Sequence, residues 1–118
     1  MPRAATSSDV FNAIAEPQRR AILDLLASEE RAVGEVERAL GLAQPSVSKH
    51  LRVLREVGLV RVRRDGRRML YRTNAAALRP LHEWAGAFEK HWRDQLRRIK
   101  ERAESSARPK RGSGSPND

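Results

Sequence analysis

Residues 33–72 read VGEVERALGLAQPSVSKHLRVLREVGLVRVRRDGRRMLYR, and this stretch decides the fold. Its first part predicts a short helix over Val33–Leu40, which Gly41 ends as a C-terminal cap. After a tight turn, a second helix begins around Pro45 and ends at Gly58. Two short helices joined by a tight turn that contains glycine are typical of a helix-turn-helix.

The second of these helices has one apolar and one polar side. Val47, Leu51 and Leu54 recur at helical spacing and are expected to face the core. The polar side chains gather near its beginning, where a helix lying in a major groove about 12 Å wide contacts base edges. Glutamine can read adenine, and arginine or lysine can read guanine. The candidate base-contacting residues are Gln44, Ser46, Ser48, Lys49, His50 and Arg52. Taken alone, the pattern also fits an amphipathic helix whose polar side is solvated.

A β-hairpin is predicted next, because the apolar residues change to a period of two after the helix. Val60 and Val62 alternate with arginines, which indicates a half-buried strand. Asp65-Gly66 is a strong signal for a hairpin turn. Residues 67–73 return as a second strand that carries Met69 and Tyr71.

The hairpin is rich in arginine, and in the local sequence only Asp65 opposes this positive charge. Such a ribbon repels itself unless an anion lies near it. A hairpin directly after a recognition helix is the wing of a winged helix, whose phosphate contacts position a protein on DNA without specifying sequence. Its arginines are Arg61, Arg63, Arg64, Arg67, Arg68 and Arg72, of which Arg63, Arg64, Arg67 and Arg68 are the candidate wing contacts. A solvated charged hairpin is the alternative.

Helices on either side of this stretch complete one domain. A first helix is predicted over Ser8–Ala15 with Ser7 or Ser8 as its cap, and Pro17 opens a second helix. A last helix begins near Ala75 and extends to about Ala103. We therefore expect an N-terminal tail at 1–7, a mainly α winged helix-turn-helix domain with a small β-hairpin at 8–103, and a disordered tail at 104–118.

The last helix carries an apolar stripe that a domain of this size cannot cover. Its apolar residues keep a spacing of three and four over about six turns. Aromatic side chains exposed together form the kind of patch that usually marks an interface, so we expect a homodimer through the first and last helices. The expected interface residues are Phe11, Leu81, Trp84, Phe88, Trp92 and Leu96. Packing within one chain and a cofactor pocket behind the two tryptophans are the alternatives.

The composition restricts the function classes further. The 118 residues carry a net charge of +9, which favours a polyanionic partner, nucleic acid before an acidic membrane surface. The chain has no cysteine, which excludes disulfides and thiolate metal sites. It has neither an apolar run of about 18 residues nor a signal peptide, so a cytoplasmic protein is expected. No catalytic arrangement or glycine-rich phosphate loop is found, so an enzyme is not expected.

The chain also resembles a known family. Residues 16–28, EPQRRAILDLLAS, together with residues 33–72, resemble the ArsR family of bacterial winged-helix repressors, and QPSVSKHLRVLREVGLV at 44–60 is the most specific part. The resemblance implies a symmetric dimer, recognition by the helix that begins around Pro45, a wing at the hairpin and repression by blocking a promoter on double-stranded DNA. Two recognition helices about 34 Å apart would enter successive major grooves, so we expect an operator that is an imperfect palindrome.

Many members of that family sense metals or arsenicals, and this chain departs from their ligand patterns. Their thiol sensors carry cysteines on the helix that Val33–Leu40 matches here. A second site of the family uses Asp, His, His and Glu on the last helix, whereas His82 and His91 are nine residues apart and would lie on opposite sides of one helix. The chain is most similar to the metal-independent branch of the family. We therefore expect no cofactor, and an unknown inducer or a partner protein is a further expected partner. A ligand- or metal-responsive sensor of the same fold and a module that binds protein or RNA are the alternatives.

Overall fold

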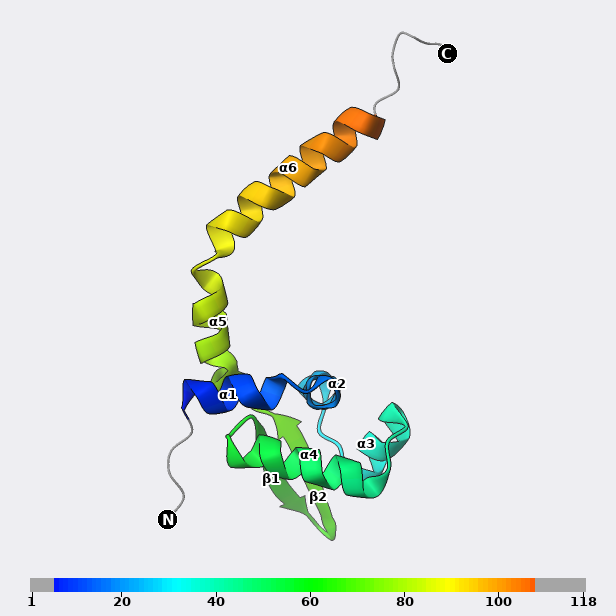
Figure 1. Cartoon of the computed structure of the whole chain (residues 1–118). Coiled ribbons are helices and arrows are strands. Elements are labelled where there is room, and N and C mark those ends of the chain that lie inside the picture. The colour runs from blue at the N-terminus through cyan, green and yellow to red at the C-terminus, as the bar shows by residue number, and fades with distance from the viewer. Residues whose placement is uncertain (1–5, 108–118) are drawn as a thin grey trace. The chain divides into compact units, whose positions relative to one another are not determined.

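The computed structural model describes residues 6–107, which form two compact units, one up to Glu83 and one from Trp84 onward (Figure 1). Most of the two predicted tails therefore lies outside the described residues. Within them, none of the helices is long and apolar enough to cross a membrane.

The first two helices are α1, Ser7–Ile14, and α2, Pro17–Ser28. The residue that caps α1 is Thr6, whereas the sequence predicted Ser7 or Ser8. Its hydroxyl accepts from the Asp9 amide at 3.3 Å, and the Asp9 carboxylate accepts from the Thr6 amide at 2.8 Å. This reciprocal pair satisfies two amides that the helix itself leaves without partners. Pro17 opens α2 as predicted.

The helix-turn-helix consists of α3, Val33–Leu40, and α4, Gln44–Glu56. Gly41 adopts a φ of 64° after α3, in the left-handed region where a side chain would be strained. The start of α3 is fixed by Glu35, whose carboxylate accepts a hydrogen bond of 2.8 Å from the Ala32 amide. The bounds of α3 are those predicted, whereas α4 begins one residue before Pro45 and ends two residues before Gly58.

Strands β1, Val60–Asp65, and β2, Arg68–Thr73, form the antiparallel hairpin. Asp65 pairs with Arg68, and Gly66 takes a φ of 65° in the two-residue turn between them. Arg31 adds a short third partner to the sheet, since its amide and carbonyl bond the Tyr71 backbone at 3.1 and 2.9 Å. On β2 the buried residue is Leu70, whereas Met69 is exposed.

One core joins the helices of the first unit to the hairpin. The apolar side of α4 packs on α2 and α3, and β1 enters the same cluster at its first residue. The buried members are Val10, Ala13, Ile22, Leu23, Leu26, Val36, Val47, Leu51, Leu54, Leu59 and Val60. Burial of apolar surface stabilises the fold by about 25 cal/mol per Å². The apolar side of α4 is therefore held in the core, and its remaining side chains are left on the surface.

The C-terminal part is not the single helix that the periodicity predicts. It consists of a 3₁₀ turn at Ala75–Leu78, α5 at Arg79–Gly86 and α6 at Glu89–Ala107. Between the two α-helices, the Ala87 and Phe88 amides bond carbonyls only three residues back, at 3.3 and 3.0 Å. Gly86 is a poor helix former and lies at this interruption. The last helix also continues to Ala107, past the predicted end at Ala103.

Candidate nucleic-acid interface

The exposed side of α4 carries most of the polar residues predicted to meet DNA. Gln44, Ser48 and Arg52 follow each other at intervals of four, so they lie along one side of the helix. The Gln44 amide donates a 2.7 Å hydrogen bond to the Ser48 hydroxyl, which orders the first turn. Lys49 is exposed and Ser46 is half-buried beside this side. The arrangement leaves donors and acceptors at the beginning of the helix.

His50 does not belong to this surface, which corrects the sequence prediction. Its side chain is 8% exposed, and its Nε2 lies 2.9 Å from Oε1 of Gln18 on α2. Val47, His50 and Leu54 stand at positions i, i+3 and i+7, so the helical period itself places the histidine on the buried side. The residue therefore fastens the recognition helix to α2.

Burial has a consequence for the charge of His50. It lowers the pKa of the imidazole below its usual 6.5, and the nearby guanidinium of Arg19 acts in the same direction. The other ring nitrogen, Nδ1, is buried without a hydrogen-bond partner among residues 6–107. A neutral imidazole is therefore the form that this packing favours.

We predict that His50 makes the fold sensitive to acid. Because the folded-state pKa lies below the unfolded value of 6.5, the stability it contributes is full above that pH and is lost as pH falls toward the folded pKa. The midpoint of thermal unfolding of the wild type should fall across this window more steeply than that of His50→Gln. Replacing the exposed His82 by glutamine serves as the control and should leave the wild-type slope in place.

The two faces of the hairpin carry different arginines. Side chains alternate along a strand, so Arg64 shares a face with Val62 and with Tyr71, the cross-strand partner of Val62. Tyr71 lines a shallow hollow together with Ser48 of α4. This is the face of the hairpin that meets α4, and Arg63 lies on the opposite face.

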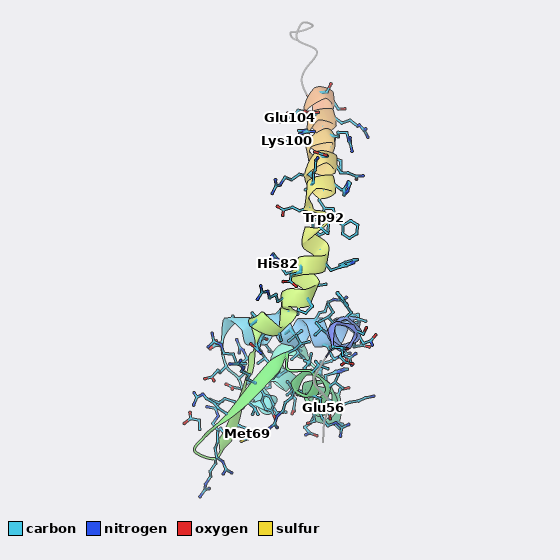
Figure 2. The ribbon with its side chains drawn as sticks, turned by 90° about the vertical axis from the view of Figure 1, so that its left-hand side faces the viewer. Glu56, Met69, His82, Trp92, Lys100 and Glu104 are labelled. Carbon is cyan, nitrogen blue, oxygen red and sulfur yellow. The ribbon has the colours of Figure 1, made fainter. Side chains whose placement is uncertain are left out.

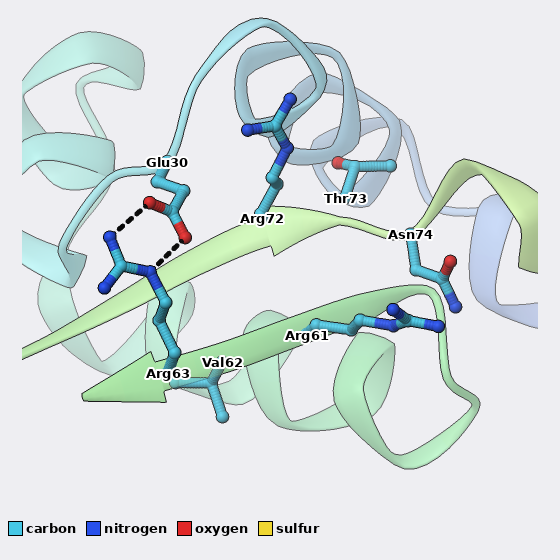
Figure 3. A pocket seen from close by; sticks show the side chains of 7 residues that line it. All are labelled: Glu30, Arg61, Val62, Arg63, Arg72, Thr73 and Asn74. Atoms are coloured by element: carbon cyan, nitrogen blue, oxygen red, sulfur yellow. Dashed lines mark hydrogen bonds and ion pairs between the residues drawn. The ribbon is translucent and has the colours of Figure 1, made fainter. Parts of the chain in front are cut away.

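Two of the predicted wing contacts are held by glutamates that the local sequence does not reveal. Arg63 donates two hydrogen bonds to the Glu30 carboxylate, at 2.7 and 2.8 Å (Figure 3). Arg68 donates one of 2.7 Å to Glu35, the residue that also fixes the start of α3. The expectation that only Asp65 opposes the arginines is therefore wrong.

These ion pairs also fix the charge states of the groups involved. The hydrogen bonds from Arg63 lower the pKa of the Glu30 carboxyl, and Glu30 in turn raises the pKa of the Arg63 guanidinium. The hydrogen bond from Ala32 is the largest cause of the lowered pKa of Glu35, with a further contribution from Arg68. Both carboxylates are charged near neutral pH. Glu30 holds the hairpin against the segment that leads into α3, and Glu35 holds it against the first turn of α3.

Arg64 and Arg67 differ from these two. Arg64 is next to the end of β1 and Arg67 lies in the turn, and neither forms an ion pair with any residue that the structure describes. Both are exposed. They are the candidate wing residues whose charge is not already engaged within the chain.

The second unit exposes an apolar row, consistent with the predicted interface. Trp92 extends from α6 into solvent and is 54% exposed (Figure 2). Its neighbours along the row are Trp84 at 58%, Phe88 at 42%, Leu96 at 64% and Ile99 at 57%. The rings of Trp84 and Phe88 meet edge to face at 5.3 Å. Of the other predicted interface residues, Phe11 and Leu81 are half-buried.

The histidines considered as metal ligands occupy different helices, His82 on α5 and His91 on α6. The expectation that both lie on one helix, on its opposite sides, is therefore wrong. Over residues 6–107, no group of three or more His, Cys, Asp or Glu could hold a metal ion.

Residues 16–62 match the family described as bacterial regulatory protein, arsR family. The chain is also 32% identical over 77 residues to the transcriptional repressor SdpR of Bacillus subtilis (strain 168), a match that covers 65% of this chain and 86% of that protein. The chain belongs to the ArsR family. Matches to several other curated relatives span 56% to 65% of the length of those proteins.

Solved structures described as ArsR-like or as possible ArsR-family regulators share the fold. An ArsR-like transcriptional regulator from Rhodococcus sp. RHA1 has a TM-score of 0.64 at 28% identity, covering 84% of this chain and 93% of that one. The homodimeric winged helix-turn-helix DNA-binding domain of Mb0332 from Mycobacterium bovis has a TM-score of 0.59 at 35% identity, covering 71% and 79%. This ArsR-family chain is a DNA-binding transcriptional regulator with a winged helix-turn-helix, as predicted, and its family is one of regulators, not enzymes.

Proposed function

We propose that this chain is a homodimeric repressor that binds an imperfect palindrome near a promoter and works without a metal. The observation that carries the proposal is that Arg64 and Arg67 are exposed and form no ion pair with a described residue, on a hairpin whose one face meets α4. Arg64 lies on the hairpin face that meets α4, and Arg67 lies at the hairpin turn. A duplex that receives α4 in its major groove would then meet Arg64 and Arg67 at the flanking phosphates.

In this proposal the recognition helix and the wing have different tasks. Base readout falls to the exposed start of α4 through Gln44, Ser46, Ser48, Lys49 and Arg52. Phosphate contact falls to Arg64 and Arg67. Arg63 and Arg68 hold the wing in position through Glu30 and Glu35, because their guanidinium groups are already engaged.

The dimer is supported by the exposed row of the second unit. Five large apolar side chains, Trp84, Phe88, Trp92, Leu96 and Ile99, are each more than 40% exposed in a single chain. An apolar surface of this kind is unusual on a monomer and typical of an interface. A second copy of the chain would bury the row and would also supply the second recognition helix that a palindrome requires.

A mobility-shift assay with DNA from upstream of the gene that encodes this chain tests the function. We expect a sequence-specific shift at physiological salt, unchanged when divalent metals are added at micromolar concentrations. Loss of the shift with one particular metal would contradict the metal-free proposal and favour a sensor. A shift that is equal on unrelated DNA would instead favour a module whose main partner is protein or RNA.

We predict that replacing Gln44 by alanine changes which operator sequences are preferred. A bidentate contact to a base contributes about 1–3 kcal/mol of discrimination, so preference at one position in each half-site should relax by about 5- to 150-fold. Selection of binding sites from a random library measures this. Ser46→Ala should alter the preference at a neighbouring position, whereas Arg67→Ala is the control that should weaken all sequences alike. An unchanged selected motif for Gln44→Ala would contradict its role in base readout.

A further inference from the structure

A basic pocket lies on the face of the hairpin that points away from α4 (Figure 3). Its volume is about 380 Å³, and both strands and the segment before α3 contribute to it. The polar residues that line it are Glu30, Arg61, Arg63, Arg72, Thr73 and Asn74. None of the tasks proposed above uses the residues that line this pocket except the ion pair between Glu30 and Arg63.

The charges in the pocket do not balance. Three guanidinium groups face one carboxylate, that of Glu30, which Arg63 holds through two hydrogen bonds. Arg61 and Arg72 are direct cross-strand partners, an arrangement that is unfavourable for like charges. Neither forms an ion pair with another described residue. The pocket therefore carries two positive charges in excess of the negative charge of Glu30, and strand pairing places Arg61 and Arg72 opposite each other.

The Glu30 carboxylate shows that an anionic group fits there. Besides the two bonds from Arg63, the positive charge of Arg72 contributes to lowering the pKa of this carboxyl. In Figure 3, Arg72 rises beside Glu30 and Arg61 extends along β1 toward Asn74. The Thr73 hydroxyl donates to the Leu23 carbonyl at 2.7 Å, and the Asn74 amide donates to the Gly58 carbonyl at 3.0 Å, so both side chains are already held in place.

We propose that this pocket binds an anion of the phosphate class between Arg61 and Arg72. Guanidinium groups suit this ligand because their planar array of donors matches two phosphate oxygens at once. Two excess positive charges match the two negative charges of a phosphate or phosphate monoester. The ligand is either a free phosphorylated metabolite or a backbone phosphate of DNA. A bound anion would compete with Glu30 for Arg63 and so loosen one of the two ion pairs that hold the wing, the one to the segment that leads into α3.

Titration with inorganic phosphate in the absence of DNA tests the pocket independently of the proposed function. Chloride replaces phosphate at constant ionic strength in the reference titration, and backbone amide shifts are followed by NMR. We expect saturable shifts at residues 61–63 and 72–74, and their loss in the double variant Arg61→Gln, Arg72→Gln. Glu30→Gln should tighten phosphate binding several-fold, because it removes the competing carboxylate. The double variant Arg98→Gln, Arg102→Gln on α6 removes the same two charges outside the pocket and should leave the binding unchanged.

The dependence of DNA affinity on salt distinguishes the two sources. If the double variant binds DNA with the wild-type slope of log K against log salt, the ligand is a free anion. If the slope flattens by about 0.9 for each phosphate that the variant no longer binds, the ligand is a DNA phosphate. Two results together overturn the proposal. The double variant keeps the wild-type slope, and the NMR titration of the wild type with phosphate shows either no saturable shifts or the same shifts as the double variant.

Discussion

Replacing Trp92 by arginine should convert the protein into a monomer. The indole is 54% exposed in the single chain and lies in the middle of the apolar row on α6. In a dimer the indole would be buried. A guanidinium in its place would lose its hydration and gain no charged partner in return, which is unfavourable. A monomer presents only one recognition helix, so affinity for the full palindrome should fall by about a thousandfold or more, because specific binding sums two half-sites.

Light scattering and a binding titration on the same sample measure both effects. The control is Glu101→Arg, which lies nine residues from Trp92 and therefore on the opposite side of the helix. It adds positive charge to α6 without entering the apolar row and should remain a dimer. Circular dichroism shows whether the Trp92 variant keeps its helices. A folded Trp92→Arg protein with the mass of a dimer would place the interface elsewhere.

The double variant Arg64→Ala, Arg67→Ala should bind every DNA sequence much more weakly than the wild type. Each guanidinium is expected to bind one phosphate, and removing a hydrogen bond to a charged group weakens binding by about tenfold or more. A symmetric dimer has two copies of each arginine, so the slope of log K against log salt should flatten by about 3.6 units. Sequence preference should not change, because these arginines do not read bases.

The matched control changes the same number of charges in the second unit. Arg98→Ala, Arg102→Ala on α6 lowers the net charge equally and is expected to alter the slope by far less. Because Arg64 and Arg67 are exposed and unpaired among the described residues, their replacement should leave the melting temperature close to that of the wild type. A change in the selected operator motif would show that the wing reads bases after all.

Most of the fold could be predicted because local sequence signals mark the beginning and end of its helices and strands. Gly41 and Gly66 mark turns that need a positive φ, Pro17 marks a helix start, and the change from helical to alternating spacing after Gly58 marks the hairpin. Errors appear where two local signals compete. The apolar spacing favours one helix from Ala75 to Ala103, but the poor helix propensity of Gly86 accompanies an interruption there.

The candidate interface was less predictable, because the decisive contacts join residues far apart in the sequence. His50 resembles a DNA-contacting residue by its polar type. It is buried instead, and its ring nitrogen lies within hydrogen-bond distance of Gln18, 32 residues earlier. Glu30 and Glu35 each lie 33 residues before the arginine they bind. In the sequence, Glu30 belongs to an ordinary polar connection and Glu35 to the predicted helix over Val33–Leu40, and neither position indicates a partner on the hairpin.

By itself, the sequence determined the order of helices and strands, the turn between α3 and α4, and the concentration of arginine on the hairpin. These follow from backbone propensity and from the period of apolar residues, which act over a few residues. Which arginines lack an ion pair among the described residues, and which face each occupies, follows instead from the packing of distant segments. That depends on the register of β1 against β2 and on the distance to glutamates from another segment, which no local pattern specifies.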